Sequence, residues 1–376
     1  MTTKIIKLLL VLVFLTVGNT IASAAPASEP AIEYITGVVV GIQPIEQAKK
    51  IQGVKSAERV KIHLTSGPES EQEVDSIVYE MDRPGFEIRP SIGDKVIVAV
   101  SQDLAHKSYN IADYDRLPYV YILIGAFTLS LLAVGGRVGI KSLFVVCFAI
   151  FIILQGMIPL ILKYHLNITL ITLLTSAIIA TVTQVTVSGW NSKTWGAILG
   201  TVGGVTIAGI LASLSVKFMH LNGLDSEEAI MLKVTYLSAI DFKEVLFAGI
   251  VLGALGAVMD VAISIASAQY EIKASCPHFG FKEIFKSGIN VGRDVMGTMS
   301  NTLILAYLGS SLPLVLLLSA QNNIPILRVL NLSLIVTEFA RAITGSIGLI
   351  CSIPLTALIT ALFLSRNTSR HHDSMK

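Results

Sequence analysis

A single carboxylate interrupts an otherwise apolar run of the sequence. Asp260 lies within residues 245–269, VLFAGIVLGALGAVMDVAISIASAQ, which are almost entirely apolar or small. A segment of this length and composition predicts a membrane-spanning helix. A carboxylate at the centre of such a helix costs about 2.5–3.5 kcal/mol on insertion scales. We therefore expect Asp260 to have an interaction partner, a bound proton or a functional role.

Small and polar residues share the helical face of Asp260. Their spacings of three, four and seven positions place them on one side of a helix. The face comprises Gly249, Gly253, Gly256, Asp260, Ser264 and Ser267. Glycines let a neighbouring backbone approach, and serines hydrogen-bond across the gap. The pattern predicts that Asp260 faces protein or water rather than lipid, and both a proton or ion site and a structural role stay open.

Two later segments also carry polar faces. One is formed by Asn290, Asp294, Gly297 and Asn301, and the other by Glu338, Arg341, Gly345, Gly348 and Ser352. Asp294 falls near the start of its predicted span, where the helix dipole stabilises an acid. Glu338 and Arg341 are spaced to pair along one helix, which favours a structural role for them. The candidate residues for a proton, ion or solute site are Asp260, Ser264, Asp294, Asn301, Glu338 and Arg341.

The composition predicts a polytopic α-helical membrane protein. Of the 376 residues, 53% are hydrophobic and 14% are charged, whereas soluble domains have about 25% charged residues. The net charge of +2 gives no sign of a nucleic-acid partner. The three cysteines form no C-x-x-C pair and the seven histidines are scattered, so we expect neither a metal site nor a cofactor.

The chain divides into a leader, a β domain and a membrane domain. Residues 1–25 have a charged start, an apolar run and a small-residue exit, which predicts a secretory signal peptide, with an uncleaved anchor as the alternative. Residues 26–116 alternate between apolar and polar positions and are divided by turns, which predicts a small all-β barrel or sandwich outside the membrane. Seven spans are predicted within 117–365, at 117–136, 142–162, 168–189, 194–218, 243–268, 294–319 and 338–364, followed by a cytoplasmic tail at 366–376.

Basic residues set the expected orientation. The positive-inside rule puts Lys- and Arg-rich joints in the cytoplasm. With residues 26–116 outside, the cytoplasmic joints hold Arg137, Lys141, Lys193, Lys273, Lys282, Lys286, Arg293, Arg366, Arg370 and Lys376. We therefore expect an odd number of spans and a cytoplasmic C-terminus. Residues 226–237 and 279–289 each have two open interpretations, an amphipathic helix at the membrane surface or a polar loop.

Glycines mark the expected helix contacts. The predicted fourth span has the small-residue stripe Ala197, Gly200, Gly204, Ala208 and Ala212, for which close packing is a sufficient explanation. The G-x-x-x-G at Gly200 and Gly204 would also allow contact with a second copy. The expected packing glycines are Gly200, Gly204, Gly249, Gly253, Gly256, Gly345 and Gly348.

Two runs of the sequence are specific enough to compare with known families, GAVMDVAISIASA at 256–268 and GRDVMGTMSNTL at 292–303. Through these runs the sequence resembles the YibE/F-like family of bacterial multi-pass membrane proteins, and the resemblance covers residues 30–365. The resemblance implies a shared helical bundle and a location in the bacterial cell membrane. It brings no activity with it.

Three functions compete on these observations. The favoured one is a transporter or permease for a small solute or ion, with Asp260 at its site. The second is a membrane assembly or sensor component that binds a protein partner through residues 26–116. The third is an intramembrane aspartyl hydrolase, which is disfavoured because Asp260 and Asp294 lack the G-x-G-D surroundings of that class and are expected at different depths. Enzymatic activity is therefore not the expectation, and the lipid bilayer is the one partner common to all three.

Overall fold

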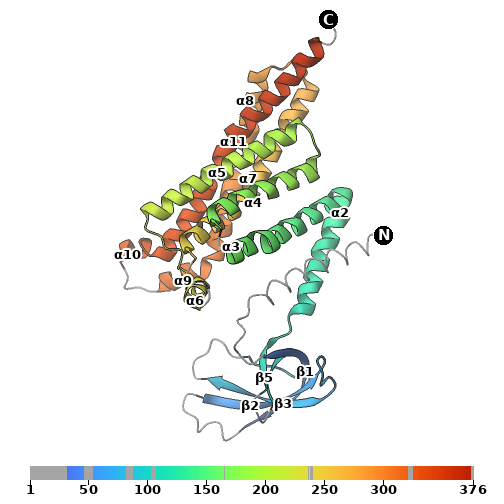
Figure 1. Ribbon diagram of the computed structural model, residues 1–376, viewed down its shortest axis with the longest axis vertical. Helices are drawn as coiled ribbons and strands as arrows, with labels where there is room; N and C mark the ends of the chain where they lie inside the picture. Colours follow the sequence, from blue (N-terminus) through green and yellow to red (C-terminus); the bar gives the residue numbers. More distant parts are fainter. Residues whose placement is uncertain are drawn as a thin grey trace. The chain divides into compact units, whose positions relative to one another are not determined.

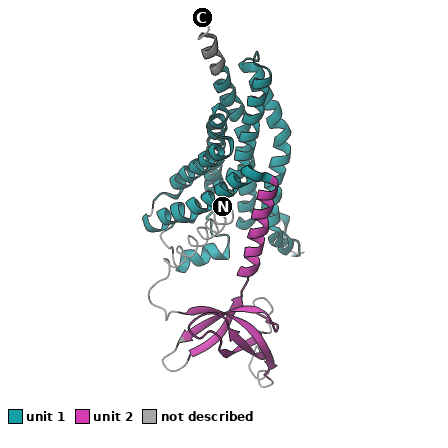
Figure 2. Cartoon of the chain, turned by 90° about the vertical axis from the view of Figure 1, so that its right-hand side faces the viewer, with its two compact units in different colours: residues 1–21, 135–376 teal, residues 22–134 magenta. Residues whose placement is uncertain are grey.

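The computed structural model describes residues 32–45, 54–81, 88–102, 107–164, 166–235, 237, 240–320 and 325–373, the last eight of these by their backbone only. The predicted signal peptide, residues 1–25, lies outside the described residues. Contacts divide the chain into two compact units, one of residues 22–134 and one that contains residues 135–376 (Figure 2). Each unit is described by itself.

The unit of residues 22–134 contains a five-stranded antiparallel sheet, whose strands are drawn as arrows in Figure 1. The strands are β1 (Glu33–Pro44), β2 (Val54–Leu64), β3 (Glu73–Met81), β4 (Lys95–Gln102) and β5 (Lys107–Tyr114). They lie in the order β3-β2-β1-β4-β5, and the sheet is nearly closed because the backbone N–H of Ile111 on β5 donates to Oγ of Ser76 on β3 at 3.2 Å. The prediction of a small barrel-like β domain is confirmed.

Alternation along the strands explains this barrel. A period of two sends every second side chain to one face of a sheet. The inward set forms one apolar core made of Ile35, Val39, Val60, Ile62, Leu64, Val96, Val98 and Val100. The predicted turn before β4 is present, with Gly93 at φ 96° and the carboxylate of Asp94 accepting from the backbone N–H of Ser91 at 2.8 Å.

The other described elements are helices. Their bounds are α2 (Leu117–Phe151), the π-helix η2 (Ile152–Met157), α3 (Ile158–Tyr164), α4 (Ile168–Ser188), α5 (Ser192–Phe218), α6 (Glu227–Thr235), α7 (Phe242–Ser275), α8 (Phe281–Ser310), α9 (Leu312–Ala320), α10 (Ile326–Leu330) and α11 (Ser333–Asp373). Five helical stretches of the described chain are long and apolar enough to cross a membrane, or six if α8 and α9, bent by 61°, count as one span. The prediction of a multi-pass helical membrane protein is confirmed at this level, and the count of seven spans stays a prediction.

Two predicted boundaries differ from the structure. The predicted spans 117–136 and 142–162 fall in one helical stretch, Leu117–Tyr164, that leaves helical geometry at Gly136 (φ 51°, ψ −122°). The sixth span was expected to begin at 294, but α8 begins at Phe281. Residues 281–289 are therefore the first turns of α8 rather than a separate surface helix or a loop, because Phe281, Ile284 and Phe285 pack against the end of α11 at Ala361 and Leu364. In the other segment with two open interpretations, residues 226–237, the structure has the helix α6 (Glu227–Thr235).

The core of the helical unit is formed by α5, α7, α8 and α11, which pack against one another (Figure 1). Its apolar centre includes Val205, Ile250, Val258, Leu349 and Ile353, all at most 4% exposed. The small-residue stripe of α5 lies within this core. An added Cβ at Gly200 would overlap Oγ1 of Thr356, and one at Gly204 would lie 2.6 Å from Cβ of Ser352, so α11 of the same chain occupies this face.

Candidate functional site

The helices α7, α8 and α11 are held together at one end by a buried glutamine. Gln269 on α7 is fully buried, and its Nε2 donates to the carbonyl oxygens of Ile284 on α8 at 2.9 Å and Ala357 on α11 at 3.0 Å. Gly288 on α8 makes room for it, since an added Cβ there would meet the Gln269 side chain. This amide sets the relative positions of the three helices. The sequence analysis did not single it out, although a lone glutamine next to an apolar run was a usable signal.

The start of α11 is fixed by an aspartate from the loop before α6. Asp225 accepts hydrogen bonds from the hydroxyls of Ser333 at 2.5 Å and Thr337 at 2.6 Å. Both hydroxyls lie in the first turns of α11, so Asp225 anchors the segment that carries Glu338. The α4–α7 pair is joined in a similar way, because Glu244 accepts from the backbone N–H of Ile168 at 3.0 Å.

An ion pair lies on α11 just beyond this anchor. Nη1 of Arg341 donates to Oε1 of Glu338 at 3.0 Å, and the two side chains are 29% and 22% exposed. The pairing along the helix that the sequence predicted is therefore present. Neither residue is fully buried in the chain alone, but both lie within a stretch of α11 that is long and apolar enough to span a membrane.

Tyr307 of α8 completes a three-residue cluster with this pair. Gly292 on α8 lies against Ile353 on α11, and Leu303 lies against Gly345, so the two helices run antiparallel and Tyr307, one turn after Leu303, is level with Arg341, one turn before Gly345. The Tyr307 hydroxyl lies against α7 at Gly253, where an added Cβ would overlap it. We call Tyr307, Glu338 and Arg341 the α8–α11 polar cluster. Tyr307 was not a predicted site residue, because no spacing rule links a tyrosine on one helix to an ion pair on another.

Three buried polar atoms of the cluster have no hydrogen-bond partner among the described residues. They are Oε2 of Glu338, Nε of Arg341 and the hydroxyl of Tyr307. Buried polar atoms in folded proteins nearly always have a partner, and an exception calls for a water, an ion or a ligand. The cluster can therefore offer two donors and one acceptor to a bound group.

The predicted face of Asp260 is one face of α7, but it is the side turned away from the packed core. Gly249, Gly253, Gly256, Asp260 and Ser264 are all exposed in the chain by itself. An added Cβ at Gly249 or Gly256 would meet nothing within 4 Å. Asp260 has no hydrogen-bond or ion-pair partner in the part of the chain that the structure describes. Its expected contact with protein or water stays a prediction.

Asp294 and Asn301 lie on the exposed side of α8. This side also carries Asn290 and Gly297, and it is opposite the buried Gly288 and Gly292. The expected place of Asp294 near a helix start is wrong, because α8 begins at Phe281 and Asp294 lies more than three turns inside it. Amphipathic turns at the start of α8 pack on α11 and carry the helix past the predicted boundary.

The helices α7 and α8 run antiparallel with a clear register. Gly292 lies against Ile265, and Tyr307 lies against Gly253. Asp260 therefore lies between these two contact levels. The structure brings Glu338 and Arg341 together with Tyr307, whereas Asp260 and Asp294 lie on exposed faces of two different helices, with no described contact between them.

The predicted packing glycines divide into two groups. Gly345 lies 3.3 Å, measured from an added Cβ, from both Ala254 on α7 and Leu303 on α8, and Gly348 packs against Gly204 and Ala208 on α5. With Gly200, Gly204 and Gly253 these glycines make close contacts inside the chain. Gly249 and Gly256 make none with the described residues, so they leave the backbone of α7 open beside Asp260.

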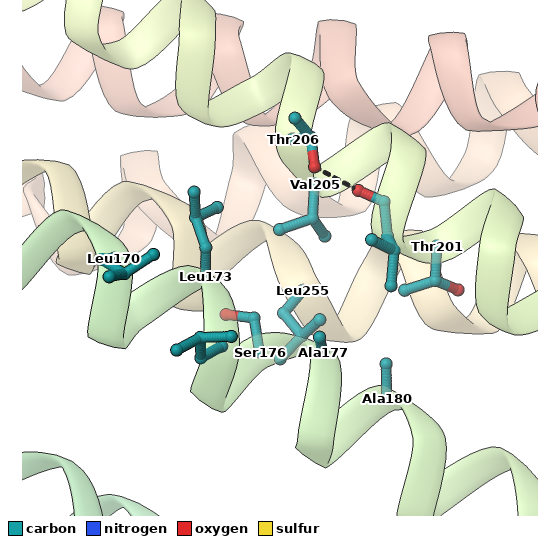
Figure 3. A pocket seen from close by; sticks show the side chains of 11 residues that line it. Leu170, Leu173, Ser176, Ala177, Ala180, Thr201, Val205, Thr206 and Leu255 are labelled. Atoms are coloured by element: carbon teal, nitrogen blue, oxygen red, sulfur yellow. Dashed lines mark hydrogen bonds between the residues drawn. The ribbon is translucent and has the colours of Figure 1, made fainter.

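A pocket of about 210 Å³ lies between α4 and α5 (Figure 3). Leucines, valines and alanines line most of it, and its polar groups are Ser176, Thr201 and Thr206. Thr201 accepts from Nε2 of Gln184 at 2.7 Å, so one of these hydroxyls is already engaged. None of the predicted site residues lines this pocket. Among the described residues, no three His, Cys, Asp or Glu side chains are grouped so that they could hold a metal ion.

Comparison with known proteins agrees with the resemblance seen in the sequence. A family model described as YibE/F-like protein matches residues 123–366, which is more than half of the chain and includes the whole α8–α11 polar cluster. No curated protein and no solved structure matches the chain. The matched region contains every helix from α3 to α10 and nearly all of the apolar part of α11. The chain therefore belongs to the YibE/F-like family.

Proposed function

We propose that this chain is a transporter or permease for a small solute or ion in a bacterial cytoplasmic membrane. Seven spanning segments, with the kink at Gly136 dividing the first two, put the β domain outside and the C-terminus in the cytoplasm. The basic residues of the joints support this orientation.

One observation carries the proposal. The α8–α11 polar cluster has three buried polar atoms without partners in helices that are long and apolar enough to span a membrane. Ionisable residues in such segments are costly and usually mark a substrate or ion pathway. Open buried atoms also occur at structural positions such as Oε1 of Gln269, but those of the cluster belong to ionisable side chains, whose burial is more costly. The open atoms of Glu338, Arg341 and Tyr307 instead favour a site that binds something.

Asp260 extends this site along α7. The hydroxyl of Tyr307 lies against Gly253, and Asp260 is two helical turns further along the same face, at a rise of about 10 Å. Gly256 lies between them and leaves the backbone accessible. In this proposal the transport path runs along this face of α7 from the α8–α11 polar cluster to Asp260. The carboxylate of Asp260 is the second binding site for a proton or ion on this path.

Flux measurements test the proposal. The purified full chain is reconstituted in vesicles of phosphatidylethanolamine and phosphatidylglycerol that contain a pH-sensitive dye, and proton movement is followed under imposed ion and solute gradients. We expect flux above that of empty vesicles, with a large loss in Asp260→Asn and in Glu338→Gln. Asp75→Asn, the same change at an exposed position of β3, is the matched control and keeps the wild-type rate. A rate equal to that of empty vesicles for every gradient contradicts the proposal.

A second candidate is a membrane assembly or sensor component, and the β domain favours it. Tyr34, Ile77 and Tyr79 are between 43% and 63% exposed. Large apolar and aromatic side chains of this kind are typical of surfaces that bind another protein. A photo-crosslinking residue in place of Tyr79, compared with the same residue in place of the exposed Lys61, tests this in cells. Partner adducts specific to position 79 support it, and equal or absent labelling at both positions contradicts it.

A further inference from the structure

We propose that the α8–α11 polar cluster binds a small oxyanion together with one proton. This inference rests on the proposed function and names its substrate class. When no anion is bound, the ionised Glu338 pairs with Arg341. Glu338 releases the guanidinium when it takes up a proton. Arg341 then binds a carboxylate, sulfonate or similar group, with the Tyr307 hydroxyl as a further donor.

The open atoms of the cluster match an oxyanion. Arg341 uses Nη1 for Glu338, while Nε has no partner among the described residues. The planar guanidinium presents its N–H groups as a fork that fits two oxygens of a carboxylate or similar anion. The hydroxyl of Tyr307 is the second open donor. A cation in the same place would meet the positive charge of Arg341.

Charge balance links the anion to a proton. The Glu338–Arg341 pair is neutral as a whole, so an added anion would leave the site with one negative charge. An uncompensated charge at membrane depth is costly. Protonation of Glu338 removes this charge and turns its carboxylate into a donor. Both the empty and the loaded site are then neutral, which predicts electroneutral movement of one proton with each monovalent anion.

The charged and polar groups described around Glu338 come from several helices. Arg341 pairs with it on α11, Tyr307 on α8 is level with Arg341, and α7 contributes the uncharged Gly253 at the Tyr307 hydroxyl. Asp225 accepts from the hydroxyl of Thr337, the residue next to Glu338, so a second carboxylate lies at this end of α11. On α5 the charged residue at this end of the helix is Lys217, which is exposed.

Binding to the full chain in detergent gives the first test. Methanesulfonate is the probe, because it stays ionised over the whole pH range and resembles a carboxylate. Binding raises the melting temperature by mass action. While Glu338 is mostly ionised, we expect the affinity to rise about tenfold for each unit of pH decrease, as required for one linked proton. A wild-type affinity that does not change with pH overturns the proposal.

Variants assign the roles. We expect Glu338→Gln to bind methanesulfonate without the pH dependence, Tyr307→Phe to bind about tenfold more weakly, and Arg341→Gln to lose binding. Arg328→Gln, the same change at an exposed position of α10, is the control and binds as the wild type. If Arg341→Gln does not elute as a folded protein, Tyr307→Phe and Arg341→Lys decide the question. Unchanged affinity in both contradicts the proposal.

Flux separates this inference from the transporter proposal. With an inward gradient of methanesulfonate, we expect the interior of wild-type vesicles to acidify without dependence on the membrane potential, and Glu338→Gln vesicles not to acidify. Flux that depends on Asp260 but does not change with added oxyanions contradicts the oxyanion site and is still consistent with the transporter proposal. Binding of methanesulfonate without any flux supports the site and contradicts the transporter.

Discussion

At the scale of single residues, the side chains that matter most lie where another helix comes close. Gly200 permits the contact with Thr356, Gly253 permits the contact with Tyr307, and Gln269 joins three helices. Each of these residues acts through the space or the atoms that it offers to a partner far away in the sequence. Changes at them are therefore expected to affect stability in proportion to the closeness of the contact.

Gly200→Ala tests the contact between α5 and α11. The added Cβ would lie 2.9 Å from Cα of Thr356, so the two backbones must separate. Overpacking costs about 1–3 kcal/mol, which exceeds the gain of about 1 kcal/mol in helix propensity. We expect a lower melting temperature of the full chain in detergent. Gly249→Ala, where nothing lies within 4 Å, is the control and should not lower it.

A double-mutant cycle tests the ion pair. Arg341→Gln leaves Glu338 without its partner, and we expect a loss of about 2 kcal/mol, below the 3–5 kcal/mol of fully buried pairs because both side chains are partly exposed. The double variant with Glu338→Gln removes both charges and should be more stable than Arg341→Gln alone. Denaturant unfolding in detergent measures all four proteins. Additive effects of the two changes would show that the pair is not coupled.

At the scale of elements, contacts between segments far apart in the chain close both units. In the helical unit, α8 is lengthened because its first turns pack on the end of α11. In the barrel, Glu69 of the β2–β3 turn accepts from Lys107 and Tyr109 of β5. With the Ser76–Ile111 bond, these contacts bring β5 to the far edge of the sheet.

The barrel contact predicts an acid-sensitive β5. The hydrogen bonds from Lys107 and Tyr109 lower the pKa of Glu69 below its ordinary value of 4.5. The stabilisation is therefore complete above that value and is lost as the pH falls through the lower pKa of the folded state. We expect the hydrogen-exchange protection factors of β5 in the full chain to fall over this range.

Glu69→Gln is the matched variant for this test. It keeps the size of the side chain and cannot titrate, so protection of β5 should be slightly lower at neutral pH and should change less with acid. The exchange of β1 is the internal control, because it lies between β2 and β4 and the described side-chain hydrogen bonds of Glu69 go to β5. Equal acid sensitivity of β5 in the wild type and the variant would rule out this role of Glu69.

At the scale of the whole molecule, the chain combines a barrel-like domain with a multi-pass helical unit. The proposed orientation puts the barrel-like domain outside the membrane and the C-terminus of the helical unit in the cytoplasm. The α7–α8 connection is then cytoplasmic and contains the half-exposed Cys276. The turn between β2 and β3 is then outside.

Thiol labelling tests this orientation. In a background with Cys147→Ser and Cys351→Ser, we expect a membrane-impermeant thiol reagent to label Cys276 in inverted vesicles but not in intact spheroplasts. Ser70→Cys, combined with Cys276→Ser, should give the reverse, because Ser70 is an exposed residue of the β2–β3 turn. Labelling of Cys276 from outside would contradict the proposed number of crossings.

The sequence by itself determined the local features of this protein. Alternation gave the strands of the barrel, apolar length gave the helices, and spacings of three and four residues put Asp260 on one face with its glycines and serine. These features follow from chain geometry over a few turns, so they can be derived without the fold. Membership of a face does not tell which neighbour covers it.

Only the tertiary structure decided which faces are covered. The stripe of Gly200 is filled by α11, the face of Asp260 is left open by the described residues, and Tyr307 joins Glu338 and Arg341 from another helix. The extension of α8 to Phe281, which packs on the end of α11, belongs to the same group. The physical reason is that each depends on packing between segments distant in the sequence, and such contacts leave no periodic signal in either segment alone.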